Sequence, residues 1–274
     1  MESRTNVLKR NNVNVLGQGA QVIVFAHGFG CDQNMWRFVT PSFLDNYTVV
    51  LFDYVGCGSS DYTAYNVERY DSLYGYAQDV IEICQELQLT DVIFVGHSVS
   101  SMIGALASLQ VPGLFSKLIF VCPSPRYIND SEYHGGFSQE DLQGLLDVMD
   151  NNYSGWANYL APVVMQNPDL PDLTKELEKS FCAADPFITR KFAKVTFFSD
   201  NRSDLQNLKI PVLILQCAED AIAPDNVGDY MHQIILGSTL VKMKATGHCP
   251  HMSHPKETID AIIDYLEPQV YQVG

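Results

Sequence analysis

The sequence contains the stretch Val92-Ile93-Phe94-Val95-Gly96-His97-Ser98-Val99-Ser100, which decides the fold class. It opens as a short, apolar, β-branched strand. A helical pattern of small and apolar residues follows the stretch at once: Met102, Ile103, Ala105, Leu106 and Ala107. A strand, a sharp turn and a helix in direct succession are the setting of a nucleophile elbow, in which a Ser at the tip exposes its hydroxyl. Ser98 is therefore the candidate nucleophile.

The residues around Ser98 fit the tight turn that such an elbow requires. Positions two before and two after the nucleophile must be small, because a larger side chain would collide with the helix. Gly96 and Ser100 occupy these positions. The usual pattern ends in Gly, so Ser100 is a departure, although its side chain is small enough to keep the turn.

Composition describes a globular chain and excludes several partners. The chain has 274 residues, of which 46% are hydrophobic and 18% charged, and its formal net charge is −15. Nucleic acids and anionic membranes bind basic surfaces, so we expect neither as a main partner. The N-terminal stretch is polar and no apolar run approaches the length of a membrane span, so we expect neither a signal peptide nor a membrane anchor.

The cysteines indicate a reducing environment. Seven are scattered along the chain without a Cys-x-x-Cys pair, which argues against a disulfide framework and against a zinc ribbon. Several lie in apolar segments and are expected to be buried free thiols. We therefore predict a cytoplasmic protein, and we expect neither a metal nor a cofactor.

Strand and helix patterns alternate along most of the chain. Continuous apolar runs predict strands at Val22–Ala26, Thr48–Phe52, Val92–Val95, Leu118–Val121, Val212–Gln216 and Leu240–Met243. Apolar residues at helical spacing predict helices at 73–87 and from about Pro255 to Leu266. The alternation predicts an α/β fold with a mostly parallel central sheet, and ligands then bind at the carboxyl ends of the strands.

One segment interrupts the alternation. From about Pro125 to Phe198 helical patterns dominate and large apolar side chains are dense. Ordinary helices covering the sheet are one interpretation, but the segment is too long for a simple crossover, which favours a lid. We therefore predict a core formed by residues 1–124 and 199–274, with a helical lid at 125–198.

An activated Ser needs a His to take its proton and a carboxylate to orient that His. In α/β arrangements the order along the chain is Ser, then Asp or Glu, then His. Asp220 follows the strand that ends at Gln216, with Glu219 and Asp225 as competing acids. His248 follows the last predicted strand and is the candidate base. His251 and His254 are interpreted as packing or surface residues.

An oxyanion hole requires two backbone N–H groups. The loop His27-Gly28-Phe29-Gly30 follows a strand directly and can present the amide of Phe29, while Val99 supplies the second amide. His27 and His97 are interpreted as structural. The loop 53–60 lacks the Lys of a P-loop and the remaining glycine of a dinucleotide fingerprint, so it is interpreted as a structural turn.

A Phe-bearing Gly loop, an elbow Ser, a loop Asp and a Gly-His loop agree in order and strand-end placement, which predicts an α/β-hydrolase. The chain resembles one branch of it, which holds the bacterial stress-response hydrolase RsbQ and the plant karrikin and strigolactone receptors. The segments that carry the resemblance are Gly28–Gln33, Phe52–Gly56, Gly96–Val99, Ser124–Asp130, Gly135–Phe137, Phe198–Arg202 and Gly247–Pro255. The last two are especially similar to the bacterial member.

The resemblance implies a Ser98–His248–Asp220 hydrolase under a four-helix lid, with an apolar pocket for a small hydrophobic ligand. The family's pocket positions fall here on Phe29, Tyr127, Phe137, Trp156, Leu160 and Phe197. Leu160 replaces an aromatic residue that is common in relatives. The resemblance further implies a partner phosphatase with a PAS domain, in a pathway that controls a general-stress sigma factor.

Two functions therefore follow from the sequence. One is a signalling hydrolase, whose slow turnover of a scarce ester-type or lactone-type ligand changes the activity of a partner. The other is a metabolic carboxylesterase or lactonase without a partner. A purely binding role is weaker, since the triad is complete in the sequence.

Overall fold

The computed structural model describes residues 6–267, so the outer ends of the two predicted core segments lie outside it. Its centre is a seven-stranded sheet in the order β1-β3-β2-β4-β5-β6-β7, in which only the β1–β3 pair is antiparallel. The strands are β1 (Asn14–Leu16), β2 (Gln21–Ala26), β3 (Tyr47–Leu51), β4 (Val92–His97), β5 (Phe115–Val121), β6 (Val212–Gln216) and β7 (Thr239–Lys242). The predicted α/β fold with a mostly parallel sheet is confirmed.

Both faces of the sheet are covered, which explains why the central strands are continuous apolar runs. Val92 and Phe94 of β4 pack toward helices α2 (Leu73–Glu86), α3 (Val99–Gln110) and α9 (Asp225–Ile234). Ile93 and Val95 point to the opposite face. That face is covered by α11 (Pro255–Leu266) and by the short 3-10 turns η1 (Gln33–Trp36) and η2 (Thr40–Phe43).

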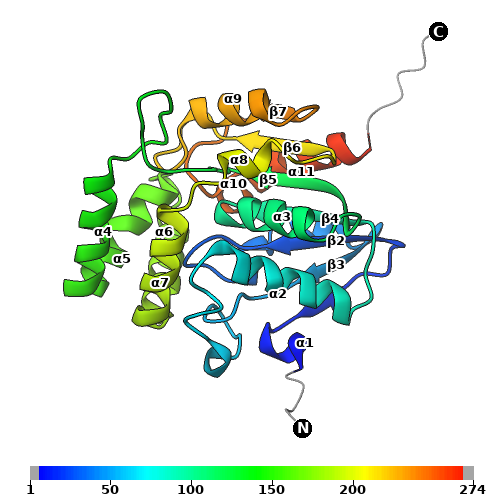
Figure 1. Cartoon of the computed structure of the whole chain (residues 1–274), viewed down its shortest axis with the longest axis horizontal. Coiled ribbons are helices and arrows are strands. Elements are labelled where there is room, and N and C mark those ends of the chain that lie inside the picture. Colours follow the sequence, from blue (N-terminus) through cyan, green and yellow to red (C-terminus); the bar gives the residue numbers. More distant parts are fainter. Residues whose placement is uncertain (1–5, 268–274) are drawn as a thin grey trace.

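Four further helices stand together at one side of the sheet in Figure 1. They are α4 (Gln139–Asn151), α5 (Tyr153–Met165), α6 (Pro171–Ala183) and α7 (Pro186–Phe197). Their apolar faces meet in a separate cluster that includes Leu146, Trp156 and Phe181. Four helices therefore occupy most of residues 139–197, within the segment for which a helical lid was predicted.

The chain enters and leaves this helical segment at one place. Asn201 donates a backbone hydrogen bond to the carbonyl of Pro125 at 2.8 Å, and Arg126 and Asp200 form an antiparallel bridge. Their side chains pair at 2.6 Å, and Arg202 adds a second guanidinium to Asp200 at 2.7 Å. These two guanidinium groups lower the pKa of Asp200 to about 2, although partial burial opposes them.

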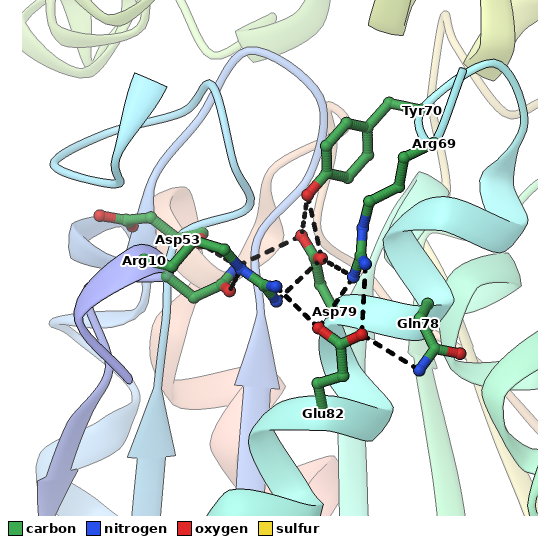
Figure 2. A network of polar contacts seen from close by, with 8 residues as sticks. Arg10, Asp53, Arg69, Tyr70, Gln78, Asp79 and Glu82 are labelled. Carbon is green, nitrogen blue, oxygen red and sulfur yellow. Dashed lines mark hydrogen bonds and ion pairs between the residues drawn. The ribbon is translucent and has the colours of Figure 1, made fainter. Parts of the chain in front are cut away.

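Several small elements were not predicted from the sequence. They include β1, α1 (Val7–Arg10), η3 (Tyr62–Ala64), α8 (Arg202–Leu205) and α10 (Pro250–Ser253). Each of these five has three or four residues, too few to show a hydrophobic period. A polar network holds α1 against α2, as Figure 2 shows, and its centre is the buried carboxylate of Asp79 between Arg10 and Arg69.

Within residues 6–267, none of the helices combines the length and the apolar character that a membrane crossing requires.

Candidate active site

Ser98 lies between β4 and α3 in a conformation that few side-chain-bearing residues adopt. Its φ is 55° and its ψ is −122°. Gly96 makes this turn possible, because a Cβ there would lie 2.6 Å from the backbone of Ser100. The backbone N–H of Ser98 donates to the carbonyl of Val121 on β5 at 2.8 Å, which anchors the turn to the sheet. Such local strain is typical of functional sites.

Ser100 is accommodated at the position where the elbow pattern usually has Gly. Its hydroxyl donates to the carbonyl of His27 and lies 2.9 Å from the hydroxyl of Tyr54. The side chain is fully buried, and these two partners satisfy its polar atom. The departure from the usual pattern therefore leaves the elbow geometry intact and links it to the neighbouring loop.

Ser98, His248 and Asp220 form an uninterrupted line of hydrogen bonds. The Oγ of Ser98 lies 2.7 Å from Nε2 of His248, and Nδ1 of His248 lies 2.7 Å from Oδ2 of Asp220. The other oxygen of Asp220 accepts the backbone N–H groups of Ile222 at 2.8 Å and Ala223 at 3.1 Å. All three side chains are buried, so the carboxylate fixes the imidazole in one orientation toward the serine.

The two competing acids lie elsewhere. Asp225 begins α9 and pairs with Lys242 at 3.0 Å. The side chain of Glu219 is exposed, while its backbone carbonyl accepts the N–H of Gly247 at 2.7 Å. Of the three candidate acids, the structure thus places Asp220 beside the His248 ring.

The other histidines near the site have structural contacts. His27 donates through Nδ1 to the carbonyl of Gly28 and accepts the N–H of Tyr54 at Nε2. His97 donates through Nε2 to the backbone carbonyl of His248 at 2.8 Å, which positions the loop that carries the candidate base. Burial lowers the pKa of both His27 and His97, so both rings are neutral.

His251 and His254 also have structural contacts, and neither is bonded to the Ser98 hydroxyl. The ring of His251 lies between Trp36, 4.5 Å away between centroids, and His97, 4.3 Å away. Burial lowers the pKa of His251 to about 3. His254 precedes α11 and contacts the hydroxyl of Ser253 at 2.9 Å.

The two candidate oxyanion donors come from neighbouring strand ends. Phe29 follows β2 and Val99 follows β4, and these strands pair in parallel up to Ala26 and Gly96. The Phe29 loop is packed closely on both sides. A Cβ at position 28 would lie 2.5 Å from the His97 ring, and one at position 30 would strike Phe181 of α6. Glycines on either side therefore allow the Phe29 loop to pass between the elbow and α6.

An inner cavity of about 30 Å³ lies at Ser98 and His248. Its apolar walls come from the Phe29 loop, α5, α6, α7 and the Asp220 loop, and they include Phe29, Leu160, Val164, Leu177, Phe181, Phe197 and Ile222. Two hydroxyls besides that of Ser98 line the cavity. That of Tyr127 lies 3.4 Å from Ser98 Oγ, and burial raises the pKa of Tyr127, so it stays protonated. That of Thr196 is buried with no hydrogen-bond partner in the described part of the chain.

A larger outer groove of about 700 Å³ lies between α4 and α5. Leu160, Phe197 and Ile222 line both the groove and the inner cavity. Of these two spaces, Phe137 lines only the groove. Trp156 lines neither, because it lies behind the cavity wall, 6.1 Å from the Phe29 ring and 5.1 Å from the Phe181 ring between centroids.

Several cavity residues were not singled out from the sequence. Ile222 lies two residues after Asp220, and Leu177 and Phe181 are one helical turn apart on α6. The first could have been found from its place beside the candidate acid, and the pair from their i,i+4 spacing. Thr196 gives no such pattern, since a single hydroxyl on a helix is unremarkable in sequence.

One group of possible metal ligands occurs among residues 6–267. Cys122, Asp220 and His248 bring ligand atoms within 4.8 Å of one another. Asp220 and His248 already bond to each other, and the thiol of Cys122 donates to Cys217 at 3.4 Å. The hydrogen-bonded line to Ser98 therefore accounts for this group without a metal.

The glycine loop after β3 is a structural turn. The carboxylate of Asp53 accepts the backbone N–H groups of Gln33 and Ser59 at 2.9 Å each, and the side-chain amide of Asn12 at 2.7 Å. These bonds hold the loop against the N-terminal segment, so Asp53 stabilises the turn itself.

Comparisons with known proteins identify the family and relatives of this chain. Residues 23–261 match the model of the alpha/beta hydrolase family. The chain is 39% identical to the karrikin insensitive 2 receptor CA of Petunia hybrida, over 96% of this chain and 98% of that protein. It is 37% identical to the strigolactone esterase D14 of Arabidopsis thaliana, over 93% and 96% respectively. The solved structure of a hydrolase from Oleispira antarctica, olei00960, superposes with a TM-score of 0.94 at 46% identity, covering 96% of this chain and 97% of that one. The chain belongs to the alpha/beta hydrolase family.

Proposed function

We propose that this chain is a serine hydrolase that cleaves a small apolar ester or lactone. The observation that carries the proposal is the hydrogen-bonded line from Asp220 through His248 to Ser98, which ends at a small and mostly apolar cavity. A serine hydroxyl becomes nucleophilic when an oriented imidazole can accept its proton. The names of the relatives, a strigolactone esterase and a karrikin receptor, are consistent with this class of ligand.

The proposed reaction is acyl transfer through an acyl-enzyme. Ser98 Oγ attacks the carbonyl carbon while His248 Nε2 takes the hydroxyl proton, and the Phe29 and Val99 amides stabilise the oxyanion. The C–O bond to the leaving alcohol then breaks, and that oxygen receives the proton from His248. Water next gives its proton to His248 and adds to the acyl carbon, and the returning proton restores Ser98 as the acid leaves.

The pocket residues have distinct parts in this proposal. Tyr127, protonated and 3.4 Å from Ser98, stands ready to donate a hydrogen bond to a substrate oxygen. Phe29, Leu160 and Phe197 supply apolar contact, while Phe137 contributes from the outer groove and Trp156 supports the Phe29 ring. The lid segment 125–198 excludes water from the cavity.

The first test is hydrolysis of p-nitrophenyl esters of increasing acyl length by the wild type and by Ser98→Ala. We expect kcat to fall by at least about 10³ in the variant, as in other serine hydrolases that lose their nucleophile. Circular dichroism and melting temperature control for folding. Undiminished turnover in a pure, folded Ser98→Ala preparation would refute the assignment.

We further propose a signalling role in the cytoplasm, with a PAS-domain phosphatase as partner in a general-stress sigma-factor pathway. The support is the sequence resemblance to the RsbQ branch and the receptor names among the relatives. A phosphatase gene of this kind beside the gene for this chain, and phosphatase activity that depends on the wild type but not on Ser98→Ala, are the expected results. Rapid turnover of many ester lengths would instead favour the metabolic esterase.

A further inference from the structure

The geometry points to a substrate divided between two chambers, an inference that rests on the proposed hydrolase function. We propose that the inner cavity takes an acyl group of one or two carbons, and that the outer groove takes a larger apolar alcohol. Leu160, Phe197 and Ile222 form the divider between the chambers and set the acyl length.

The size of the inner cavity limits the acyl group. A free volume of about 30 Å³ corresponds to roughly two water-sized spaces. A formyl or acetyl group fits such a space, whereas each further CH₂ must displace a wall residue. Close-packed interiors resist this kind of intrusion, so longer acyl chains are excluded by the wall.

The divider is one side chain thick. Leu160 of α5, Phe197 of α7 and Ile222 of the Asp220 loop each contact both spaces, and each is about 5% exposed. Their side chains are apolar and carry no hydrogen bonds, so their shape alone limits both chambers. The groove therefore shares a wall with the site already described and is not an unrelated surface.

The position of Ile222 tells which part of the substrate enters the groove. The backbone N–H of Ile222 donates to Asp220, and Asp220 orients His248. The leaving oxygen must lie within reach of Nε2 of His248, since that atom returns the proton. Ile222, which lines the groove, thus belongs to the loop that holds the acid–base pair, and we assign the alcohol to this side of the site.

Gly144 of α4 keeps the groove open. A glycine inside a helix is less stable than alanine at the same position. Nothing lies within 4 Å of where a Cβ of Gly144 would stand, so close packing does not require this glycine. It lines the groove together with Val148 and Tyr159. Its missing side chain therefore supplies space rather than contact.

Another cavity touches the inner one, but it fits an apolar alcohol less well. It has about 180 Å³ and lies beyond Phe29 and Cys31. Polar groups of Asp32, Ser180 and Thr189 line it. An apolar group would strip water from these atoms, which is unfavourable. Filling each cavity in turn can therefore separate the two routes.

The test compares two series of esters on variants that fill or join the chambers. One series keeps p-nitrophenol and lengthens the acyl group from formyl to octanoyl. The other keeps the acetyl group and compares ethyl acetate with 1-naphthyl acetate. Gly144→Phe places a bulky ring in the groove, Ala183→Phe places one in the cavity beyond Phe29, and Glu140→Phe places the same side chain on α4 at a position that lines neither.

We expect Gly144→Phe to lower kcat/KM for 1-naphthyl acetate at least about tenfold and to leave ethyl acetate nearly unchanged. The Ala183→Phe and Glu140→Phe variants should resemble the wild type on both esters. Ile222→Ala, which keeps the N–H to Asp220, should raise the butyrate-to-acetate ratio of kcat/KM about tenfold. These changes follow from roughly fourfold per buried CH₂.

Two results would overturn the two-chamber assignment. One is an unchanged kcat/KM for 1-naphthyl acetate in Gly144→Phe. This result would show that the alcohol does not enter the groove, and would make the groove a candidate site for a protein partner. The other is an equal loss in Ala183→Phe, which would place the alcohol beyond Phe29. Either result leaves the hydrolase proposal standing as long as Ser98→Ala abolishes turnover, so the two failures are distinguishable.

Discussion

The hydroxyl of Thr196 is a polar atom placed in an apolar wall. Thr196 belongs to α7, is about 1% exposed, and lines the inner cavity beside Ser98. Its Oγ1 has no hydrogen-bond partner among the residues that the structure describes. A buried unpaired hydroxyl costs stability, so a residue of the same shape without it, valine, is the natural comparison.

We expect Thr196→Val to stabilise the protein and to weaken catalysis. Removing an unsatisfied hydroxyl should raise the free energy of unfolding by about 1–3 kcal/mol. If the hydroxyl bonds to the substrate, KM should rise while kcat changes less. Urea unfolding and ester kinetics on the same preparation measure both effects. A stabilised variant with wild-type KM would assign Thr196 a packing role only.

His251 makes the stability of the fold depend on pH. Its ring is fully buried, and both nitrogens are unpaired within the described residues. Burial, with smaller effects of the charges on His248 and Arg37, lowers the pKa of His251 to about 3. The unfolded chain takes up this proton near pH 6.5. Its contribution to stability is therefore full above about pH 6.5 and is lost as the pH falls toward 3.

We expect His251→Phe to flatten this pH dependence. Phenylalanine keeps a ring between Trp36 and His97, but it cannot bind a proton. The slope of the unfolding free energy between pH 6 and pH 4 should fall by about 1.4 kcal/mol per pH unit. Part of the slope remains, since the pKa values of His27 and His97 are also lowered. Parallel curves for wild type and variant would contradict the argument.

At the scale of single residues, sequence reasoning located those whose chemistry goes with a recognisable local pattern. Ser98 follows a strand and precedes a helix, and Asp220 and His248 each follow a strand end, so their places could be predicted. The wall residues Thr196 and Ile222 could not, because their role depends on how α7 and the Asp220 loop meet in space. Trp156 was expected in the pocket, yet its ring lies one layer behind it.

At the scale of elements, a buried ion network joins the N-terminal helix to the sheet-covering layer. Arg10 of α1 and Arg69 contact the fully buried Asp79 of α2 at 3.1 and 2.7 Å, and both also contact Glu82 (Figure 2). The hydroxyl of Tyr70 donates to Asp79 at 3.0 Å. A buried network of this kind adds little net stability, but removing one partner leaves buried polar groups unsatisfied.

We expect Asp79→Ala to lower the free energy of unfolding by about 1–3 kcal/mol, because Arg10, Arg69 and Tyr70 lose a buried acceptor while Glu82 still pairs with both guanidinium groups. Asp172→Ala is the matched control. Asp172 pairs with Lys175 on the surface, at 3.3 Å and with both side chains mostly exposed, so its loss should cost at most about 1 kcal/mol. Equal losses in the two variants, measured by urea unfolding, would show that burial of Asp79 is energetically unimportant.

Strands and helices were predicted correctly where their apolar pattern extends over enough residues to be recognised. The buried runs of β2, β4, β5 and β6 and the amphipathic stripe of α2 were all predicted within a few residues. The strand β1 was missed, because it has three exposed residues at the sheet edge and so lacks a burial pattern. Pairing with β3, which no local pattern encodes, makes it a strand.

For the whole molecule, the parallel sheet explains how distant residues reach one place. Phe29, Ser98, Asp220 and His248 follow β2, β4, β6 and β7, and the carboxyl ends of parallel strands share one edge. This property follows from the fold class, so the sequence was sufficient to predict it. The chamber sizes were not predictable, since they depend on side-chain packing between α4, α5 and α7 and the core.

The bridge between Arg126 and Asp200 has a consequence for how such proteins diverge. The four helices leave the sheet and return to it through adjacent backbone, joined by the bond from Asn201 to Pro125. An excursion whose ends already touch can be lengthened, shortened or exchanged with that of a related protein while the strand order is kept. The part of the cavity lining that α4 to α7 supply can therefore change while the strand ends that hold Ser98, Asp220 and His248 stay in place.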